Sequence, residues 1–146
     1  MNRAIYWVIG LLVAALLAVG VYALSGGFQP KLALEGTEWV LVSYGPQGAQ
    51  QAALGTAEVT AIFDNAEGRV AGSGSVNRYF GGYTVDGNKL TIGENLGSTK
   101  MMGPADAMNQ ETAYFNLLAA AESFSIVGDR LEIAASDGGL LVFQAR

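Results

Sequence analysis

The chain has 146 residues, of which 51% are hydrophobic, 14% are charged and 20 are glycine, a composition typical of one ordered domain rather than of a disordered chain. Thirteen acidic residues outnumber eight basic ones, and the net charge of -5 disfavours nucleic acid as a partner, because binding phosphates needs a basic patch. The absence of cysteine and histidine excludes disulfides, thiolate nucleophiles, Ser-His-Asp triads and imidazole metal ligands.

Residues 1–24 are predicted to be an N-terminal transmembrane anchor. From Ala4 to Leu24 the chain runs for 21 residues without a charge, and a helix of this length matches a bilayer core of roughly 30 Å. A cleaved signal peptide is the alternative, although its apolar core usually runs for only about 7 to 15 residues. We therefore expect one span in the cytoplasmic (inner) membrane with the domain facing the periplasm or cell exterior, or a secreted domain if the segment is cleaved.

Residues 25–31 contain two glycines and a proline and are predicted to be a flexible linker to a domain over 32–146. Leu34–Tyr44 reads as the first strand, with Thr37, Trp39, Leu41 and Ser43 on one face and Trp39 as a core anchor. A polar loop follows over 45–55. Alternating apolar residues between turn signals predict further strands over 58–64, 69–74, 83–86, 89–92, 98–102, 123–127, 130–134 and 140–143.

One segment, Ala105–Ala121, has the period of a helix. Its apolar side chains recur three or four residues apart, and Asp106 near the start suits a helix N-terminus; the stripe consists of Met108, Tyr114, Phe115, Leu117 and Leu118. Several short antiparallel strands with one helix predict an α+β, mainly β fold, namely a small, partly closed antiparallel barrel or strongly bent sheet that the α-helix covers.

The least random segment spans residues 72–83, where four glycines and three aromatic residues surround Asn77 and Arg78. One interpretation is a ligand-facing patch, because the planar fork of Arg78 suits carboxylate or phosphate and Tyr79 and Tyr83 add stacking surface. The other is structural: Asn77 caps the corner, Arg78 pairs with a carboxylate and the aromatic rings fill the core. The sequence favours the structural interpretation.

Glu111 falls beside the apolar stripe of the helix, so it needs a partner if it is buried. Arg78 or Lys100 is the expected partner. Two pairs of nearby acidic residues, Glu35 with Glu38 and Asp64 with Glu67, are expected to be solvated charges, since closeness in sequence does not make the facing carboxylates that a glycosidase requires. No metal site or cofactor is predicted.

Several motifs in this order resemble the META domain, the HslJ-like heat-shock family. They are Gly36-Thr37-x-Trp39, Gly72-Ser73-Gly74 followed by Asn77-Arg78-Tyr79, Thr99-Lys100-Met101, and Met108-x-Gln110-Glu111 at the start of the helix. The resemblance covers about Leu34 to Phe143. It implies an antiparallel β domain with one helix, found in envelope or secreted bacterial proteins, associated with stress responses and without an established catalytic activity.

The sequence departs from the family pattern at two positions. The family commonly has cysteines after the Gly-Ser-Gly stretch and after the Thr-Lys/Arg-Met stretch, and here these positions hold Val76 and Gly103. A redox or disulfide role of that pair is therefore lost, and packing must replace a bridge that typically contributes about 2 to 4 kcal/mol.

Three functions remain as hypotheses. The first is a membrane-tethered, non-catalytic binding or structural module that contacts an envelope protein, peptide or small ligand. The second is an inhibitor of a cell-wall-degrading enzyme, which only the family resemblance suggests. The third is a carboxylate-dependent hydrolase, which the absence of histidine and cysteine disfavours. The sequence gives no indication of the oligomeric state.

Overall fold

The computed structural model describes residues 31–146, so the predicted anchor over 1–24 and nearly all of the predicted linker lie outside the described residues. Within 31–146, no helix is both long and apolar enough to cross a bilayer. The described chain forms ten strands and one helix. The elements are β1 (Glu38–Pro46), β2 (Gln51–Ala52), β3 (Thr60–Asp64), β4 (Arg69–Ser73), β5 (Arg78–Asp86), β6 (Lys89–Ile92), β7 (Gly97–Ser98), α2 (Ala105–Ala119), β8 (Ala121–Val127), β9 (Arg130–Ala135) and β10 (Gly139–Ala145).

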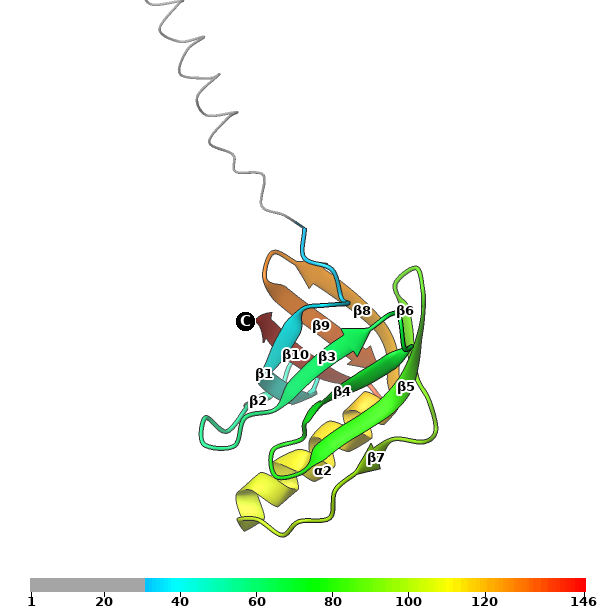
Figure 1. Cartoon of the computed structure of the whole chain (residues 1–146). Helices are drawn as coiled ribbons and strands as arrows, with labels where there is room; N and C mark the ends of the chain where they lie inside the picture. The colour runs from blue at the N-terminus through cyan, green and yellow to red at the C-terminus, as the bar shows by residue number, and fades with distance from the viewer. Residues whose placement is uncertain (1–30) are drawn as a thin grey trace, which may run out of the picture. The chain divides into compact units, whose positions relative to one another are not determined.

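Eight of the strands close into an antiparallel barrel, in the order β1-β10-β9-β8-β6-β5-β4-β3 and back to β1 (Figure 1). The first and last strands pair along their whole length, from Trp39 opposite Ala145 to Pro46 opposite Gly139. The prediction of a partly closed barrel or bent sheet is therefore corrected to a closed barrel. The seam between β6 and β8 is the thinnest, because Lys89 opposite Ser123 is its one paired position.

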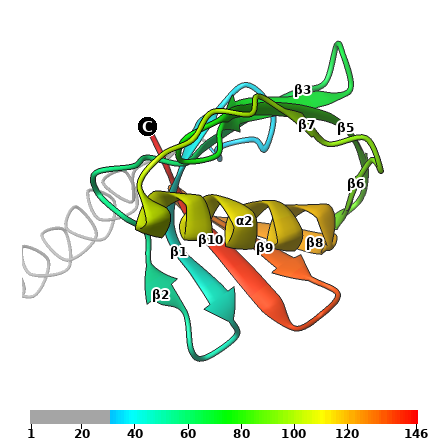
Figure 2. The same cartoon turned by 90° about the horizontal axis from the view of Figure 1, so that it is seen from below.

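The helix α2 lies across one end of the barrel rather than over an outer face (Figures 1 and 2). Its inward side consists of Ala107, Gln110, Glu111, Tyr114, Leu117 and Leu118. Two predicted members of the apolar stripe, Met108 and Phe115, are only partly buried. The buried face is thus shifted toward two polar residues, Gln110 and Glu111, which become central to the site described below.

Most predicted strand positions are confirmed. The predicted loop over 45–55 contains the short strand β2, however, and β5 begins at Arg78, inside the predicted corner, and exposes Phe80 instead of burying it in the core. Two further corrections concern the first strand and residues 98–102. The first strand contains a β-bulge, where the register with β10 shifts between Leu41 and Ser43. Because of this extra residue Tyr44 is buried, and Ser43 does not continue the inward face of Trp39 and Leu41 as predicted. The second correction concerns 98–102, where the strand β7 ends at Ser98.

The core of the described residues is rich in aromatic rings. Trp39 is fully buried, as predicted, and its indole Nε1 donates a hydrogen bond to the Leu34 carbonyl at 2.9 Å. Tyr114 on α2 packs edge-on against Tyr79 of β5 and Phe143 of β10, with ring centroids 5.5 and 6.3 Å apart. These contacts fix the helix against the end of the barrel.

Candidate functional site

The corner between β4 and β5 is shaped by glycines that allow close approach. A Cβ atom at Gly72 would lie 2.1 Å from the Thr60 carbonyl oxygen, and one at Gly74 would lie 2.4 Å from the Phe115 ring. Ser75 follows with a φ of 117°. Among the described residues it is the one residue other than glycine with a positive φ. Backbone conformations of this kind persist only where the surroundings hold them, and those surroundings come from α2.

The carboxylate of Glu111 holds this corner. Its Oε2 accepts hydrogen bonds from the backbone N–H groups of Val76 at 2.9 Å and Asn77 at 2.6 Å, and its Oε1 accepts one from Asn77 Nδ2 at 2.7 Å. Glu111 is 5% exposed. A buried carboxylate is tolerated when several N–H groups satisfy it, and the turn provides them here.

Asn77 connects that carboxylate to the segment after β7. Its side-chain oxygen accepts hydrogen bonds from Thr99 Oγ1 and from the Met101 N–H, each at 2.7 Å, and its Nδ2 also donates to the Met101 carbonyl at 3.1 Å. All the hydrogen-bonding capacity of this 3% exposed amide is therefore used within the protein. Asn77 and Glu111 form a closed polar cluster.

The expected ion pair of Glu111 with Arg78 or Lys100 is wrong. The ion pairs of the described residues are formed by Arg69, Arg130 and Arg146 with nearby glutamates. The side chain of Arg78 is exposed on the outside of the barrel. Side chains alternate along a strand, and the next residue, Tyr79, points inward. Sequence reasoning assumed that a buried carboxylate requires a cation, whereas backbone N–H groups of the turn take that role.

Gln110, next to Glu111, ties the helix to a second loop. Its Oε1 accepts a hydrogen bond from the Leu54 N–H at 2.7 Å, and its Nε2 donates to the Ala57 carbonyl at 2.8 Å and to Ser75 Oγ at 3.2 Å. The side chain is fully buried. Although Gln110 belongs to the motif at the start of the helix, nothing in its spacing indicated these partners, which are more than 30 residues away in the chain.

Tyr79 and Tyr114 form a buried pair. Their hydroxyl oxygens lie 2.6 Å apart, and the Tyr79 hydroxyl also donates to the Thr60 carbonyl at 2.9 Å. Burial raises the pKa of both phenols above its ordinary value. Both groups therefore stay protonated near neutral pH and contribute packing and hydrogen bonds.

Tyr83 is buried in a different way. Its hydroxyl is the one buried side-chain nitrogen or oxygen atom in residues 31–146 that has no hydrogen-bond partner, and Glu35 and Asp64 lie near it. Burial, followed by the negative charges of Glu35 and Asp64, raises the pKa of this phenol. Its ring packs edge-on against Phe63, with centroids 5.0 Å apart.

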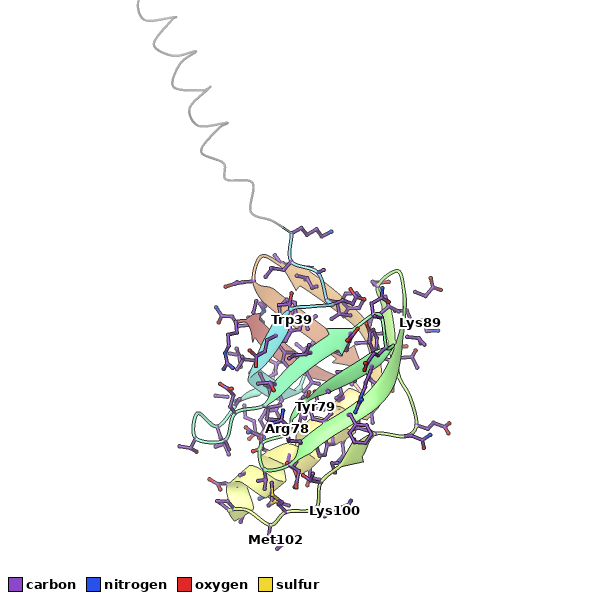
Figure 3. All side chains as sticks on the ribbon, viewed as in Figure 1. Trp39, Arg78, Tyr79, Lys89, Lys100 and Met102 are labelled. Carbon is purple, nitrogen blue, oxygen red and sulfur yellow. The ribbon has the colours of Figure 1, made fainter. Side chains whose placement is uncertain are left out.

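The five residues singled out from the sequence thus occupy three separate environments. Asn77 and Glu111 share the closed cluster, Tyr79 and Tyr83 lie in the core, and Arg78 lies on the outer face of β5, where Figure 3 labels it beside Tyr79. The groove that Arg78 lines together with Asp64 and Glu67 includes none of the other four residues. Nor does this part of the chain hold a group of three or more acidic side chains that could bind a metal ion.

A surface that sequence reasoning missed lies outside the barrel on β3, β4 and β5. Ile62, Ala71 and Phe80 stand opposite one another in the register of these strands and form what we call the outer strip. Ile62 is 43% and Phe80 50% exposed. Apolar residues at these outward positions were the available signal, because the outer face of a barrel strand is usually polar.

Two arginines border the outer strip. The guanidinium carbon of Arg69 lies 4.6 Å from the centroid of the Phe80 ring, a cation–π contact. Arg78 borders a groove of about 370 Å³ that Ile62, Asp64, Glu67, Arg69, Ala71 and Gly72 also line. Within the described chain Arg78 has no ion-pair partner.

A family model described as the META domain matches residues 32–146. Among solved structures, an NMR structure of a protein from Burkholderia xenovorans is 25% identical, with a TM-score of 0.66, and the match covers 77% of this chain and 83% of that one. A second NMR structure is 17% identical, with a TM-score of 0.58 over 77% of this chain and 94% of that chain, and supports the fold alone. No curated protein matches the sequence.

Proposed function

The chain belongs to the META domain family, and from this premise we propose that its barrel is a non-catalytic module that binds a protein or peptide of the cell envelope through the outer strip. The main support for this proposal is that the side chains of Ile62 and Phe80 are about half exposed and lie beside Arg69 and Arg78. Exposed apolar residues with a polar rim mark contact surfaces, and aromatic residues and arginine dominate the energy of such contacts.

The charges indicate the partner's chemistry. Arg78 lacks an ion pair within the described residues, and an arginine fork recognises carboxylates with two parallel hydrogen bonds. We therefore expect the partner to place an apolar side chain on Phe80 and a carboxylate against Arg78. Asp64 and Glu67 at the other side of the groove would then repel a partner bound in the reversed direction.

The absence of catalysis is part of the proposal. The polar groups of the corner bond to one another in the closed cluster of Asn77 and Glu111, which leaves no free base or nucleophile there. The sequence contains no histidine or cysteine to replace them. A hydrolase-substrate screen should give no turnover; turnover that disappears when one carboxylate is replaced, with the fold intact, would contradict this part.

We also propose that residues 1–24 tether the domain to the cytoplasmic membrane with the barrel on the outer side, and that the protein acts in the envelope stress response. The uncharged run over 4–24 supports the tether, and the family resemblance supports the stress role. Membrane fractionation with intact-mass measurement tests the tether. A soluble species that begins near Leu24 would replace it with a secreted domain.

Site-specific crosslinking tests the partner surface. A photo-reactive residue at Phe80 in the full chain should give a defined adduct in the source cell, whereas the same residue at Val127, a 76% exposed position on β8, should not. The Arg78→Glu change should abolish the adduct. Lys89→Glu, which alters the net charge equally on β6, is the matched control and should leave it unchanged.

Adducts of equal strength at Phe80 and Val127, or an adduct that survives Arg78→Glu, would contradict the proposal. If the adduct contains a cell-wall-degrading enzyme, an assay of that enzyme with and without the domain decides between simple binding and inhibition.

A further inference from the structure

The β-bulge in β1 directs Tyr44 toward a hollow beneath α2. Strict alternation from Trp39 and Leu41 would point Tyr44 outward, but the register shift between Leu41 and Ser43 reverses its direction. Tyr44 is accordingly only 6% exposed, whereas Val42, which alternation already places outward, is 45% exposed. Bulges often serve to re-aim a side chain at a binding site.

The hollow, which we call the Tyr44 pocket, has a volume of about 330 Å³. Its lining includes the apolar residues Leu117, Ala113 and Pro46 and the polar residues Gln51, Asn116 and Asp137. Pockets for small molecules combine an apolar body with a few convergent polar groups in this way, and their volumes begin at about 300 Å³.

The ring of Tyr44 is largely buried, but its hydroxyl forms no hydrogen bond with another described residue and, unlike the Tyr83 hydroxyl, is not closed off from solvent. Tyr79 and Tyr114 differ, since their hydroxyls bond to each other. A hydroxyl that water reaches can exchange that water for a polar group of a ligand, so the Tyr44 hydroxyl is available to a ligand. Burial raises its pKa, which keeps the group protonated near neutral pH.

The walls of the pocket are held in place by the turn between β9 and β10. Asp137 Oδ1 accepts a hydrogen bond from the Gly139 N–H at 2.9 Å, which fixes the carboxylate at the rim. Gly139 leaves room for the helix, because a Cβ atom there would lie 2.1 Å from Leu117 Cδ2. The site is thus formed before any ligand arrives.

The charge of the lining selects the ligand. Asp137 is its single ionised side chain, and no lysine or arginine lines the pocket. An anion would meet an uncompensated carboxylate, whereas N–H groups would find acceptors in Asp137 and in the Tyr44 oxygen. We propose that the Tyr44 pocket binds a small amine, amidine or amide with an apolar body about the size of one ring.

This inference does not depend on the proposed function, because the pocket and the outer strip share no residue. The test uses three probes that have the same ring and differ in charge: benzamidine, benzamide and benzoate. Each is titrated into the ¹⁵N-labelled full chain while backbone amide shifts are followed. Probes of this size are expected to bind in roughly the millimolar range.

Benzamidine and benzamide should give saturable shifts at Gly45, Leu117, Gly138 and Gly139, and benzoate should bind more weakly than both. Tyr44→Phe should weaken benzamide about three- to tenfold by removing one hydrogen bond. Asp137→Asn should weaken benzamidine about two- to fivefold and leave benzamide unchanged. Asp86→Asn, an exposed turn carboxylate outside the pocket, is the matched control and should change neither.

If Tyr44→Phe fails to fold, Asn116→Ala replaces it, since Asn116 is exposed on α2 and lines the pocket. Three results would overturn the inference: no saturable shift with any probe, benzoate binding as tightly as benzamidine, or Asp86→Asn weakening benzamidine as much as Asp137→Asn. The last result would show that the cation only samples the acidic surface.

Discussion

The side chain of Val76 fills the space that a side chain at Gly103 would need. A Cβ atom on Gly103 would lie 2.6 Å from Val76 Cγ2, 2.9 Å from Cγ1 and 3.4 Å from Cβ. These are the two positions at which the family commonly has cysteines, so the branched valine and the absent side chain together replace a bridge by packing. The two residues are coupled, because Gly103 cannot gain a side chain while Val76 keeps its place.

The first prediction concerns volume at this contact. Gly103→Ala alone should destabilise the domain by about 1 to 3 kcal/mol, because the new methyl group overlaps Val76. In the Val76→Ala background the same change should cost much less, since the space is then empty. Chemical denaturation of the four proteins measures the coupling. Strictly additive losses would disprove the contact.

The second prediction restores the bridge. The Cβ separation of 3.4 Å falls just below the usual disulfide range of about 3.5 to 4.5 Å, so the double variant Val76→Cys, Gly103→Cys should oxidise after only a small backbone movement. The bond should raise the unfolding free energy by about 3 to 4 kcal/mol. Denaturation with and without a reductant measures the gain, and single-cysteine variants, which cannot cross-link internally, are the controls.

The third prediction separates Glu111 from Arg78. Glu111→Gln should cost about 2 to 4 kcal/mol, because in either orientation the amide N–H₂ would face a donor, namely the backbone N–H groups at the Oε2 position or Asn77 Nδ2 at the Oε1 position. Arg78→Ala should change stability by about 0.5 kcal/mol or less. Urea unfolding of both variants tests this. A large loss with Arg78→Ala would revive the ion pair expected from the sequence.

The fourth prediction compares two tyrosines on the same strand. Tyr79→Phe removes hydrogen bonds to Thr60 and Tyr114 and should destabilise the domain by about 1 to 3 kcal/mol. Tyr83→Phe removes a buried hydroxyl that has no partner, so stability should stay the same or rise. Each variant is the other's control in thermal unfolding. A similar loss in both would mean that the Tyr83 hydroxyl is satisfied in solution.

The fifth prediction is an alkaline transition. The pKa of each tyrosine in residues 31–146 is raised by burial, whereas the unfolded chain titrates near pH 10. Above that pH the unfolded state has lost protons that the folded state keeps, so stability is full below about pH 10 and falls as pH rises further. Tyrosinate absorbance from these residues should appear together with loss of the β circular dichroism signal. If these tyrosines ionise gradually while the circular dichroism signal of the folded protein is retained, the prediction is wrong.

Local signals in the sequence were sufficient for most strands and for the helix. The Asp86-Gly87-Asn88 turn between alternating apolar residues indicated the β5–β6 hairpin, since positive φ at Gly87 is a local requirement of such turns. The helix was equally clear from its apolar period. The resemblance to the META domain is confirmed by the family model that covers residues 32–146.

Local sequence signals could not predict the β-bulge in β1 or the hydrogen-bond partners of Glu111. An extra residue in β1 changes no local propensity, because its position depends on how Leu41 and Ser43 pair with β10 about 100 residues later in the chain. Likewise, the N–H groups that Glu111 binds become available only when the turn at Ser75 adopts its conformation beside α2.

The amino-acid order alone therefore determined which segments become strands, turns and helix, because these preferences act between residues close in the chain. Only the tertiary structure decided that β1 and β10 close the barrel, that Tyr44 turns inward, and that Val76 compensates for Gly103. Those features arise from contacts between distant segments, where steric fit and hydrogen-bond satisfaction select among arrangements that local sequence leaves equivalent.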